Sequence, residues 1–288
     1  MVDFIAASFV RRKEDVIELR NLLKKYGKEK LNIIAKIENQ EGYDNLEEIL
    51  EVVDGIMVAR GDLGVEIPTS MVPIYQKRMI RLSNLYGKYV IVATHMLDSM
   101  THNPRCTRAE ASDVANAVLD GGDSVMLSAE SAAGEYPVEA VSTMAEIALA
   151  AENTFSHKYY LNHLRERVAN SIQDTIGLTA VEACMNLDIK AIIVFTQGGT
   201  TARRISKYRP TVPIYAVTFS KEVLGALTVS WGVHPVLSDV QNNMTNDDEL
   251  ASKVAKENGI KPGELILLSA GYPTGEGSAN MIKIIAVK

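Results

Sequence analysis

The chain has 288 residues, of which 47% are hydrophobic, and a net charge of −6. This length can bury a sizeable core in one large domain or two smaller ones. The acidic excess without a basic block argues against nucleic acid as a partner, and no apolar run approaches the ~18 residues of a membrane span. No signal-peptide pattern is seen, and Cys106 and Cys184 lie too far apart to suggest a disulfide framework. We therefore expect a soluble, cytoplasmic protein.

The first half of the chain alternates short apolar runs with amphipathic segments. The apolar runs predict strands at residues 2–10, 31–37, 54–58, 88–94 and 123–128. The intervening patterns predict helices at residues 13–26, 44–51, 71–86, 108–119 and 137–152. This alternation is typical of βα units and hence of a parallel sheet.

Polar residues follow the predicted strands where each strand ends. They are Ser8 with Arg11, Lys36 with Glu38, Arg60 with Asp62, Thr94, and Ser128 with Glu130. A TIM barrel places its active site at this edge of the strands. A barrel needs eight strands and this half supplies five, so residues 1–155 are expected to be a partial TIM (β/α)8 barrel, its last five strands. Such a barrel would leave strand edges open at residues 4–10 and 123–128.

The second half begins with a polar segment, residues 156–169, which we interpret as a connector helix. Residues 170–288 are expected to form a smaller α/β domain. Its predicted strands are residues 191–195, 213–217, 233–237, 265–269 and 281–287, and its predicted helices are residues 170–187, 201–207, 221–229 and 247–257.

Lys36, Glu38 and Asp62 carry the clearest chemical signal. Lys36 and Glu38 are two residues apart, so an extended strand directs both to one face. Carboxylate oxygens suit Mg²⁺ or Mn²⁺, and a lysine beside the metal can stabilise an oxyanion. The alternative is a solvated salt-bridge cluster, but an unpaired ammonium between Ala35 and Ile37 would be costly.

Two neighbouring segments complete this region. Gly61 and Gly64 allow the backbone amides near Asp62 to approach a phosphate or carboxylate, although an ordinary βα turn would show the same pattern. Thr94 ends a strand, and its hydroxyl could relay a proton to a substrate carbon, although a β-branched residue is also ordinary at a strand end. The sequence has no nucleophile elbow and no zinc-ligand spacing.

A second candidate site follows the strand at residues 191–195. Hydroxyls, backbone amides, a helix N-terminus and basic side chains make a phosphate cradle plausible here. The candidate residues are Thr196, Gln197, Gly198, Gly199, Thr200, Thr201 and Arg203, with Arg204 and Lys207 further along the helix. A capped helix with a solvated basic face is the alternative. The Gly-rich segment at residues 270–278 could close over the same ligand.

Taken together, these segments resemble the pyruvate kinase family along essentially the whole chain. The resemblance is carried by Ala6-Ala-Ser-Phe-Val-Arg11, Ala35-Lys-Ile-Glu-Asn-Gln-Glu-Gly42, Gly55-Ile-Met-Val-Ala-Arg-Gly-Asp-Leu-Gly-Val-Glu-Ile-Pro68, Ala93-Thr-His-Met-Leu-Asp-Ser-Met100, Asn103-Pro-Arg-Cys-Thr-Arg-Ala-Glu110, Asp113-Val-Ala-Asn-Ala117, Val125-Met-Leu-Ser-Ala-Glu130 and Ser206-Lys-Tyr-Arg-Pro210.

The resemblance implies phosphoryl transfer from phosphoenolpyruvate to ADP, giving pyruvate and ATP. It implies that Lys36 stabilises the enolate, that Glu38 and Asp62 bind Mg²⁺ or Mn²⁺, and that Lys36, Gly61, Asp62 and Thr94 line the phosphoenolpyruvate site. Thr94 would lie near the path of proton delivery. Residues 170–288 are similar to the family's effector-binding domain, with a sugar-phosphate pocket at residues 196–201. Homo-oligomers, commonly tetramers, are expected.

The chain also departs from the family pattern. His95 stands where glutamine is usual, and Cys106 where proline is usual. The first three barrel strands, the lid domain and the ligands of the family's K⁺ ion are not found, so little or no turnover is expected of this chain. Two other hypotheses remain open: a Mg²⁺-dependent barrel lyase of an enolate-forming acid, and a non-catalytic truncated product that binds a sugar phosphate or intact subunits.

Overall fold

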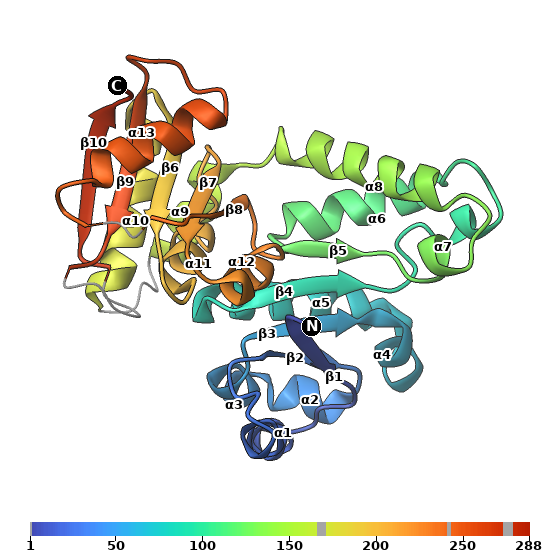
Figure 1. The fold of residues 1–288 in the computed structure, drawn as a ribbon. Coiled ribbons are helices and arrows are strands. Elements are labelled where there is room, and N and C mark those ends of the chain that lie inside the picture. Colours follow the sequence, from blue (N-terminus) through green and yellow to red (C-terminus); the bar gives the residue numbers. More distant parts are fainter. Residues whose placement is uncertain (1, 166–170, 241–242, 273–278) are drawn as a thin grey trace. The chain divides into compact units, whose positions relative to one another are not determined.

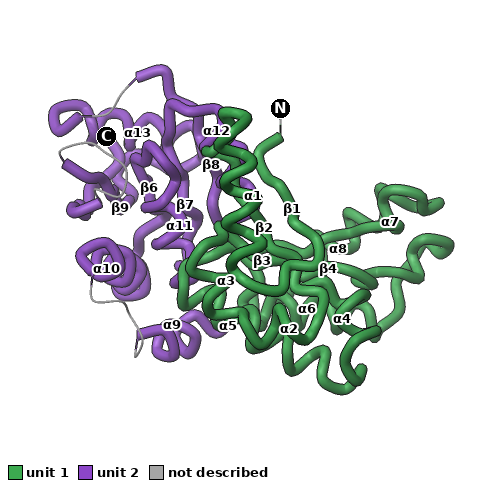
Figure 2. The backbone as a smooth tube through the Cα atoms, turned by 90° about the horizontal axis from the view of Figure 1, so that it is seen from below, with its two compact units in different colours: residues 1–155 green, residues 156–288 purple. Residues whose placement is uncertain are grey.

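The structure is a computed structural model that describes residues 2–165, 171–240, 243–272 and 279–288. Its chain separates into two compact units, residues 1–155 and residues 156–288 (Figure 2). Each unit contains one five-stranded sheet.

The sheet of the first unit consists of five parallel strands that pair in the order of the sequence (Figure 1). The strands are β1 (Phe4–Ala7), β2 (Asn32–Ile37), β3 (Gly55–Ala59), β4 (Tyr89–Ala93) and β5 (Ser124–Met126). Parallel strands paired in sequential order and joined by helices are the pattern of a βα barrel. The predicted fold class, five barrel-type strands followed by a smaller α/β domain, is confirmed.

Helices cover one face of this sheet and bury the main core of the unit. They are α1 (Lys13–Lys25), α2 (Gln40–Asp44), α3 (Leu46–Val52), α4 (Arg60–Glu66), α5 (Val72–Tyr86), α6 (Arg108–Leu119), α7 (Ala129–Ala132) and α8 (Pro137–Glu152), with short 3-10 turns η1 (Thr69–Met71) and η2 (Asp98–Thr101). On β2, Ile33, Ala35 and Ile37 belong to this core, whereas Ile34 belongs to a smaller cluster. Because side chains alternate along a strand, Lys36 shares the face of Ile34, away from the helices.

The boundaries of the longer helices follow from local signals in the sequence. Gly87 takes a left-handed φ of 64° and ends α5. At the start of α6, the Thr107 side chain accepts a hydrogen bond from the Glu110 backbone amide, and the Glu110 carboxylate accepts one from the Thr107 amide. This reciprocal capping box satisfies two amides that a helix start otherwise leaves free.

Two short stretches differ from the sequence prediction. The helix expected at residues 44–51 is two helices, α2 and α3, which meet at Asn45. Asn39 caps α2 by accepting a hydrogen bond from the Gly42 amide at 2.8 Å, so the helix starts earlier than expected. The segment after β3, expected to be a turn, is helix α4, which packs the fully buried Leu63 into the core despite its two glycines.

The second unit has a sheet in the order β10-β9-β6-β7-β8, in which only the β9–β10 pair is antiparallel. Its strands are β6 (Ile189–Phe195), β7 (Ile214–Thr218), β8 (Val233–Leu237), β9 (Leu265–Ala270) and β10 (Met281–Ala286). Its helices are α9 (His157–Arg165), α10 (Ile172–Asn186), α11 (Thr200–Ser206), α12 (Lys221–Leu227) and α13 (Asp247–Glu257). Pro235 lies in β8, an outer strand, where a missing backbone donor is tolerated.

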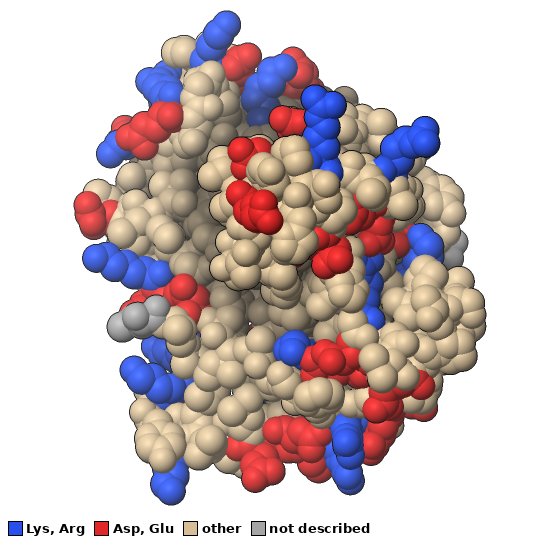
Figure 3. Space-filling view, turned by 90° about the vertical axis from the view of Figure 1, so that its right-hand side faces the viewer, with Lys and Arg blue, Asp and Glu red and all other residues tan. Residues whose placement is uncertain are grey.

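Within the described ranges, no helix is both long and apolar enough to cross a bilayer. Acidic and basic side chains are interspersed on the face of the molecule drawn in Figure 3.

Two helical glycines, Gly42 in α2 and Gly64 in α4, give a matched test of how closely the helices of the first unit pack. A Cβ at Gly42 would lie 2.4 Å from the Val10 carbonyl oxygen, whereas at Gly64 the nearest atom would be Val72 Cγ2 at 3.7 Å. We expect Gly42→Ala to lower the free energy of unfolding by about 1–3 kcal/mol, because the backbone must move. Gly64→Ala should be neutral or stabilising by up to about 1 kcal/mol. Urea unfolding measures both, and equal effects would contradict this packing.

Candidate functional site

Lys36 and Glu38 form an ion pair at the C-terminal end of β2. The Lys36 Nζ atom lies 2.6 Å from Glu38 Oε1 and donates a hydrogen bond of 3.2 Å to Ser8 Oγ, just after β1. The Lys36 side chain is 25% exposed and that of Glu38 only 1%. A nearly inaccessible carboxylate is thus compensated by an ammonium that still reaches solvent.

The second oxygen of Glu38 is held by the backbone after β1. Glu38 Oε2 accepts a hydrogen bond of 2.5 Å from the Phe9 amide. Phe9 has a positive φ of 53°, which is uncommon for a bulky residue and costs free energy. Because Phe9 is itself 57% exposed, burial of its ring does not offset this cost. The strained turn serves to direct an amide at the Glu38 carboxylate.

Among the described residues, Glu38 Oε1 has no hydrogen-bond donor in good geometry despite its burial, and the ion pair with Lys36 compensates it. Asp62, in the first turn of α4, is exposed and makes no hydrogen bond or ion pair with the described residues. Across the described ranges, no three His, Cys, Asp or Glu side chains cluster as a metal site. Two carboxylates at neighbouring strand ends fit a cation that takes its other ligands from water or substrate.

Thr94 directly follows β4 and contacts Gly61 after β3. The Gly61 amide donates a hydrogen bond of 2.8 Å to Thr94 Oγ1, and that hydroxyl donates one of 2.6 Å to the Ala93 carbonyl. Thr94 and His95 have positive φ values of 70° and 51°. For a β-branched residue this conformation is strained, and such strain gathers at functional sites.

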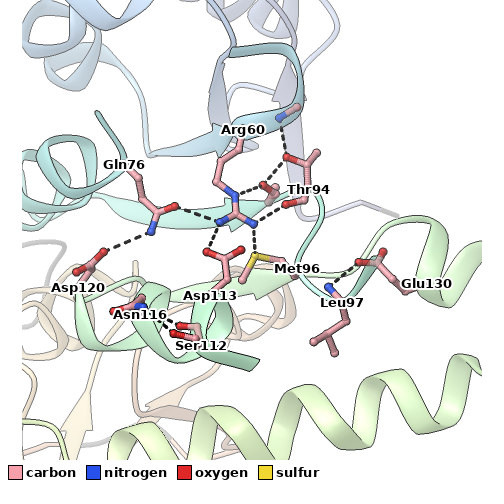
Figure 4. A network of polar contacts seen from close by, with 12 residues as sticks. Arg60, Gln76, Thr94, Met96, Leu97, Ser112, Asp113, Asn116, Asp120 and Glu130 are labelled. Carbon is pink, nitrogen blue, oxygen red and sulfur yellow. Dashed lines mark hydrogen bonds and ion pairs between the residues drawn. The ribbon is translucent and has the colours of Figure 1, made fainter. Parts of the chain in front are cut away.

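Arg60 is hydrogen-bonded to the backbone around Thr94 (Figure 4). Its Nε donates to the Ala93 carbonyl at 3.1 Å, and its Nη2 donates to the Thr94 carbonyl at 2.5 Å and contacts Met96 Sδ at 2.8 Å. The guanidinium, only 11% exposed, therefore holds the backbone of the strained Thr94 through two carbonyl groups.

The outer side of the Arg60 guanidinium meets helices α5 and α6. Its Nη1 lies 2.6 Å from Asp113 Oδ1 and 3.4 Å from Gln76 Oε1. Gln76, which is buried, donates to Asp120, and Asp120 also pairs with Lys77. This network leads from the strand end to the outer helices.

Two glutamates organise the loops beside Thr94 through their hydrogen bonds. Glu130, 2% exposed, accepts the Leu97 amide at 3.1 Å (Figure 4). It also accepts the Ser128 amide at 2.7 Å. Glu110 accepts the amide and hydroxyl of Ser99, at 2.7 and 2.6 Å, and those of Thr107. Glu130 thus joins the segments after β4 and β5.

The pKa of Glu110 reflects two opposing influences. Burial raises it, but hydrogen bonds from the side chain and backbone of Ser99 and Thr107 favour the carboxylate more strongly. The net pKa lies below its ordinary value of 4.5.

In the second unit, the loop after β6 is closed by its own side chains. The Gly199 amide donates to Thr196 Oγ1 at 2.9 Å, and Gly199 takes a left-handed φ of 78° before α11. Thr196 and Thr201 are buried, while Gln197, Gly198, Thr200 and Arg203 are half-buried. Arg203 Nη2 lies 3.5 Å from Thr200 Oγ1, the upper limit for a hydrogen bond.

Lys207, expected to add positive charge to this loop, is instead 8% exposed and paired with the buried Asp174 of α10. Its charge is thereby compensated within the unit. The closing segment expected at residues 270–278 lies largely outside the described residues.

The sequence indicated most of the polar residues at the strand ends but not their partners. Phe9 contributes its amide, and no side-chain pattern marks such a role. Arg60 follows a predicted strand, but the sequence assigns it no function, and its partner Asp113 lies 53 positions away. Ser8 follows the predicted strand that precedes that of Lys36, and this shared strand-end position is the signal in the sequence that indicates their contact.

Fold and site together define an α/β protein of the barrel type, with a charged polar site at the C-terminal ends of its parallel strands. Comparison with known proteins narrows this class. The family model described as "Pyruvate kinase, barrel domain" matches residues 1–141, and the one described as "Pyruvate kinase, alpha/beta domain" matches residues 174–285.

Relatives named pyruvate kinase match the whole chain. That of Clostridium acetobutylicum is 49% identical over 292 residues, covering 100% of this chain and 61% of the relative. That of Staphylococcus epidermidis is 53% identical, covering 98% and 48%, and that of Bacillus licheniformis is 52% identical, covering 99% and 49%. The chain belongs to the pyruvate kinase family, as its motifs predicted, and spans about half the length of the curated relatives it matches.

The hydrogen bonds to Glu110 predict a pH-dependent contribution to stability. We expect Glu110→Gln to lower the free energy of unfolding at neutral pH by about 1 kcal/mol, the usual value of a helix cap. Because the folded-state pKa is lowered, the carboxylate's contribution is present above the unfolded value of 4.5 and is lost as the pH falls through the folded pKa. The difference between wild type and variant should therefore shrink on acidification.

Denaturant unfolding across this pH range measures the effect. Glu139→Gln, an exposed position in the first turn of α8, is the matched control and should change stability by less than about 0.5 kcal/mol. A wild-type advantage at position 110 that stays constant or grows on acidification would contradict the assigned role of the charge.

Proposed function

We propose that this chain carries the enolate-stabilising and metal-binding part of a pyruvate kinase site, which transfers a phosphoryl group from phosphoenolpyruvate to ADP in glycolysis. The observation that carries the proposal is the Lys36–Glu38 pair, a buried carboxylate with one oxygen compensated by a half-buried ammonium and, among the described residues, by no hydrogen-bond donor. Family membership supports the activity class. The cytoplasm is the proposed location.

In this proposal, Lys36 acts on the substrate oxygen. Breaking the bond between phosphorus and the enol oxygen leaves an enolate, while the phosphorus forms a new bond to a terminal phosphate oxygen of ADP. The Lys36 ammonium, 25% exposed at the strand end, would stabilise the enolate oxygen. Carbon 3 of the enolate then accepts a proton to give pyruvate.

Glu38 and Asp62 are the proposed ligands of Mg²⁺ or Mn²⁺. Glu38 Oε1, which has an ion pair but no hydrogen-bond donor, and the exposed carboxylate of Asp62, which has no partner among the described residues, fit an oxygen-seeking cation. When bound, such a cation would supply positive charge beside the phosphoryl group. The Phe9 amide fixes the Glu38 carboxylate, and Lys36 would be released from Glu38 toward the substrate.

Gly61, Asp62 and Thr94 are the proposed remaining contacts of phosphoenolpyruvate. The Gly61 amide and the Thr94 hydroxyl lie 2.8 Å apart, joining the ends of β3 and β4. We assign Thr94 to the path of the proton. In the described geometry its hydroxyl proton is donated to the Ala93 carbonyl, so the hydroxyl must rotate to reach a substrate.

The protonation step can be tested alone through its reverse, exchange of the pyruvate methyl protons with solvent. We expect the chain with Mg²⁺ to catalyse deuterium incorporation into pyruvate, followed by NMR. Lys36→Met should reduce the rate at least about 100-fold, because the developing enolate loses its cation. Glu38→Gln should also lose activity, whereas Glu41→Gln, an exposed carboxylate three residues along, should not.

Exchange no faster than with Mg²⁺ alone would overturn the proposed site. Complete phosphoryl transfer, measured by coupling pyruvate formation to lactate dehydrogenase, is expected to be low for these 288 residues. A barrel lyase would instead cleave aldol substrates. Family membership disfavours that alternative.

For the second unit we propose a sugar-phosphate effector site at residues 196–201 with Arg203. The support is family resemblance together with a closed loop in which Arg203 lies beside the Thr200 hydroxyl. Lys207 is excluded from this site by its pair with Asp174. Assembly into homo-oligomers, as tetramers, is proposed on the resemblance alone.

Calorimetric titration with phosphorylated sugars tests the effector site. Arg203→Ala should weaken binding by roughly 10-fold or more, because a charged hydrogen bond to phosphate is lost. Lys253→Ala, which removes an exposed cation of α13 in the same unit, should leave binding unchanged. Absence of heat with every sugar phosphate tried would count against the site.

A further inference from the structure

The geometry points to Arg60 as a positioning residue that holds the Thr94 hydroxyl ready for proton transfer and remains a hydrogen-bond donor to the Ala93 carbonyl when that hydroxyl turns to the substrate. This inference rests on the proposed function of Thr94. It assigns a role to a residue that contacts the backbone around Thr94 rather than the reacting atoms.

The first support is the shared acceptor. The Ala93 carbonyl receives hydrogen bonds from the Thr94 hydroxyl at 2.6 Å and from Arg60 Nε at 3.1 Å. A hydroxyl has a single proton to donate, so Thr94 must leave Ala93 before it can donate elsewhere. Ala93 is fully buried. Without Arg60, its carbonyl would have neither of these two donors once the Thr94 hydroxyl turned away, and an unsatisfied buried acceptor costs free energy.

The second support is the backbone strain. Thr94 holds a φ of 70° and His95 one of 51°, and each such conformation costs free energy. Arg60 Nη2 donates to the Thr94 carbonyl at 2.5 Å, between these two strained residues. A charge-assisted hydrogen bond at this point offsets part of the cost and fixes the direction of the hydroxyl.

The third support is the rigidity of the guanidinium itself. Asp113, from α6, lies 2.6 Å from Nη1, and Gln76 of α5 adds a longer contact to the same nitrogen (Figure 4). The five donors of a guanidinium have a fixed planar geometry, so holding one edge orients the other. Lysine keeps the charge, but its donors lie on one nitrogen and do not reproduce this planar geometry.

The chain offers a matched control in Arg20. Its Nε donates to the Val52 carbonyl at 2.9 Å and its Nη2 pairs with Asp54 at 2.8 Å, a similar arrangement before β3 rather than after it. Arg20→Lys removes the same kind of contacts far from the C-terminal ends of the strands.

The test compares Arg60→Lys with Arg20→Lys by two readouts. With ¹³C-methyl-labelled threonine, the Thr94 methyl resonance, assigned by its loss in Thr94→Val, should shift in Arg60→Lys and not in Arg20→Lys. In the pyruvate exchange assay, Arg60→Lys should lower the rate roughly 10- to 100-fold, as expected for a mispositioned group, and Arg20→Lys should not. Unfolding midpoints show whether both variants fold.

A double-mutant cycle separates positioning from general stability. In a Thr94→Val background, Arg60→Lys should cause no further loss of exchange, because its effect passes through the hydroxyl. Equal losses in both backgrounds would overturn the inference. An unmoved Thr94 methyl resonance in Arg60→Lys would overturn it as well, whether or not exchange is seen. Absence of exchange in the wild type together with a shifted resonance would refute the proposed function and leave the positioning role supported.

Discussion

The candidate site depends on one constraint, the parallel pairing of the neighbouring strands β1, β2, β3 and β4. Lys36 pairs with Met57 in register, and Ala59 pairs with Ala93, so the strands end together. The residues that follow each strand are consequently neighbours, although 28 positions separate Ser8 from Lys36 and 33 separate Gly61 from Thr94. A slip of one residue would turn Lys36 toward the apolar helices.

The buried charge of Glu38 explains how the polar groups at this edge of the sheet are arranged. Glu38 is almost inaccessible and would be unstable alone, so a lysine and a backbone amide compensate it. Lys36 lies on β2 and the Phe9 amide lies just after β1, and both strands are held in place by their pairing in the sheet. The strained residues Phe9 and Thr94 are tied into the same arrangement, which indicates that local stability is sacrificed for the position of polar groups.

The outer helices support the strand ends through Arg60. Asp113 and Gln76 lie on α6 and α5, so the packing of these helices sets the guanidinium and, through it, the backbone at Thr94. Substitutions on α5 or α6 can therefore alter the site without touching a substrate. In the second unit a buried pair, Lys207 with Asp174, joins the C-terminal end of α11 to α10.

Hydrophobic alternation and turn residues in the sequence were enough to place the strands, the long helices and the strand-end residues Lys36, Glu38, Asp62 and Thr94, because these depend on local periodicity. The division into α2 and α3 and the helical state of α4 required tertiary packing of Asn45 and Leu63. Only the folded structure decided that Phe9 holds Glu38, that Arg60 shares the Ala93 carbonyl with Thr94, and that Lys207 belongs to Asp174. Each of these contacts joins distant segments, and local sequence carries no record of which backbone group a side chain will meet.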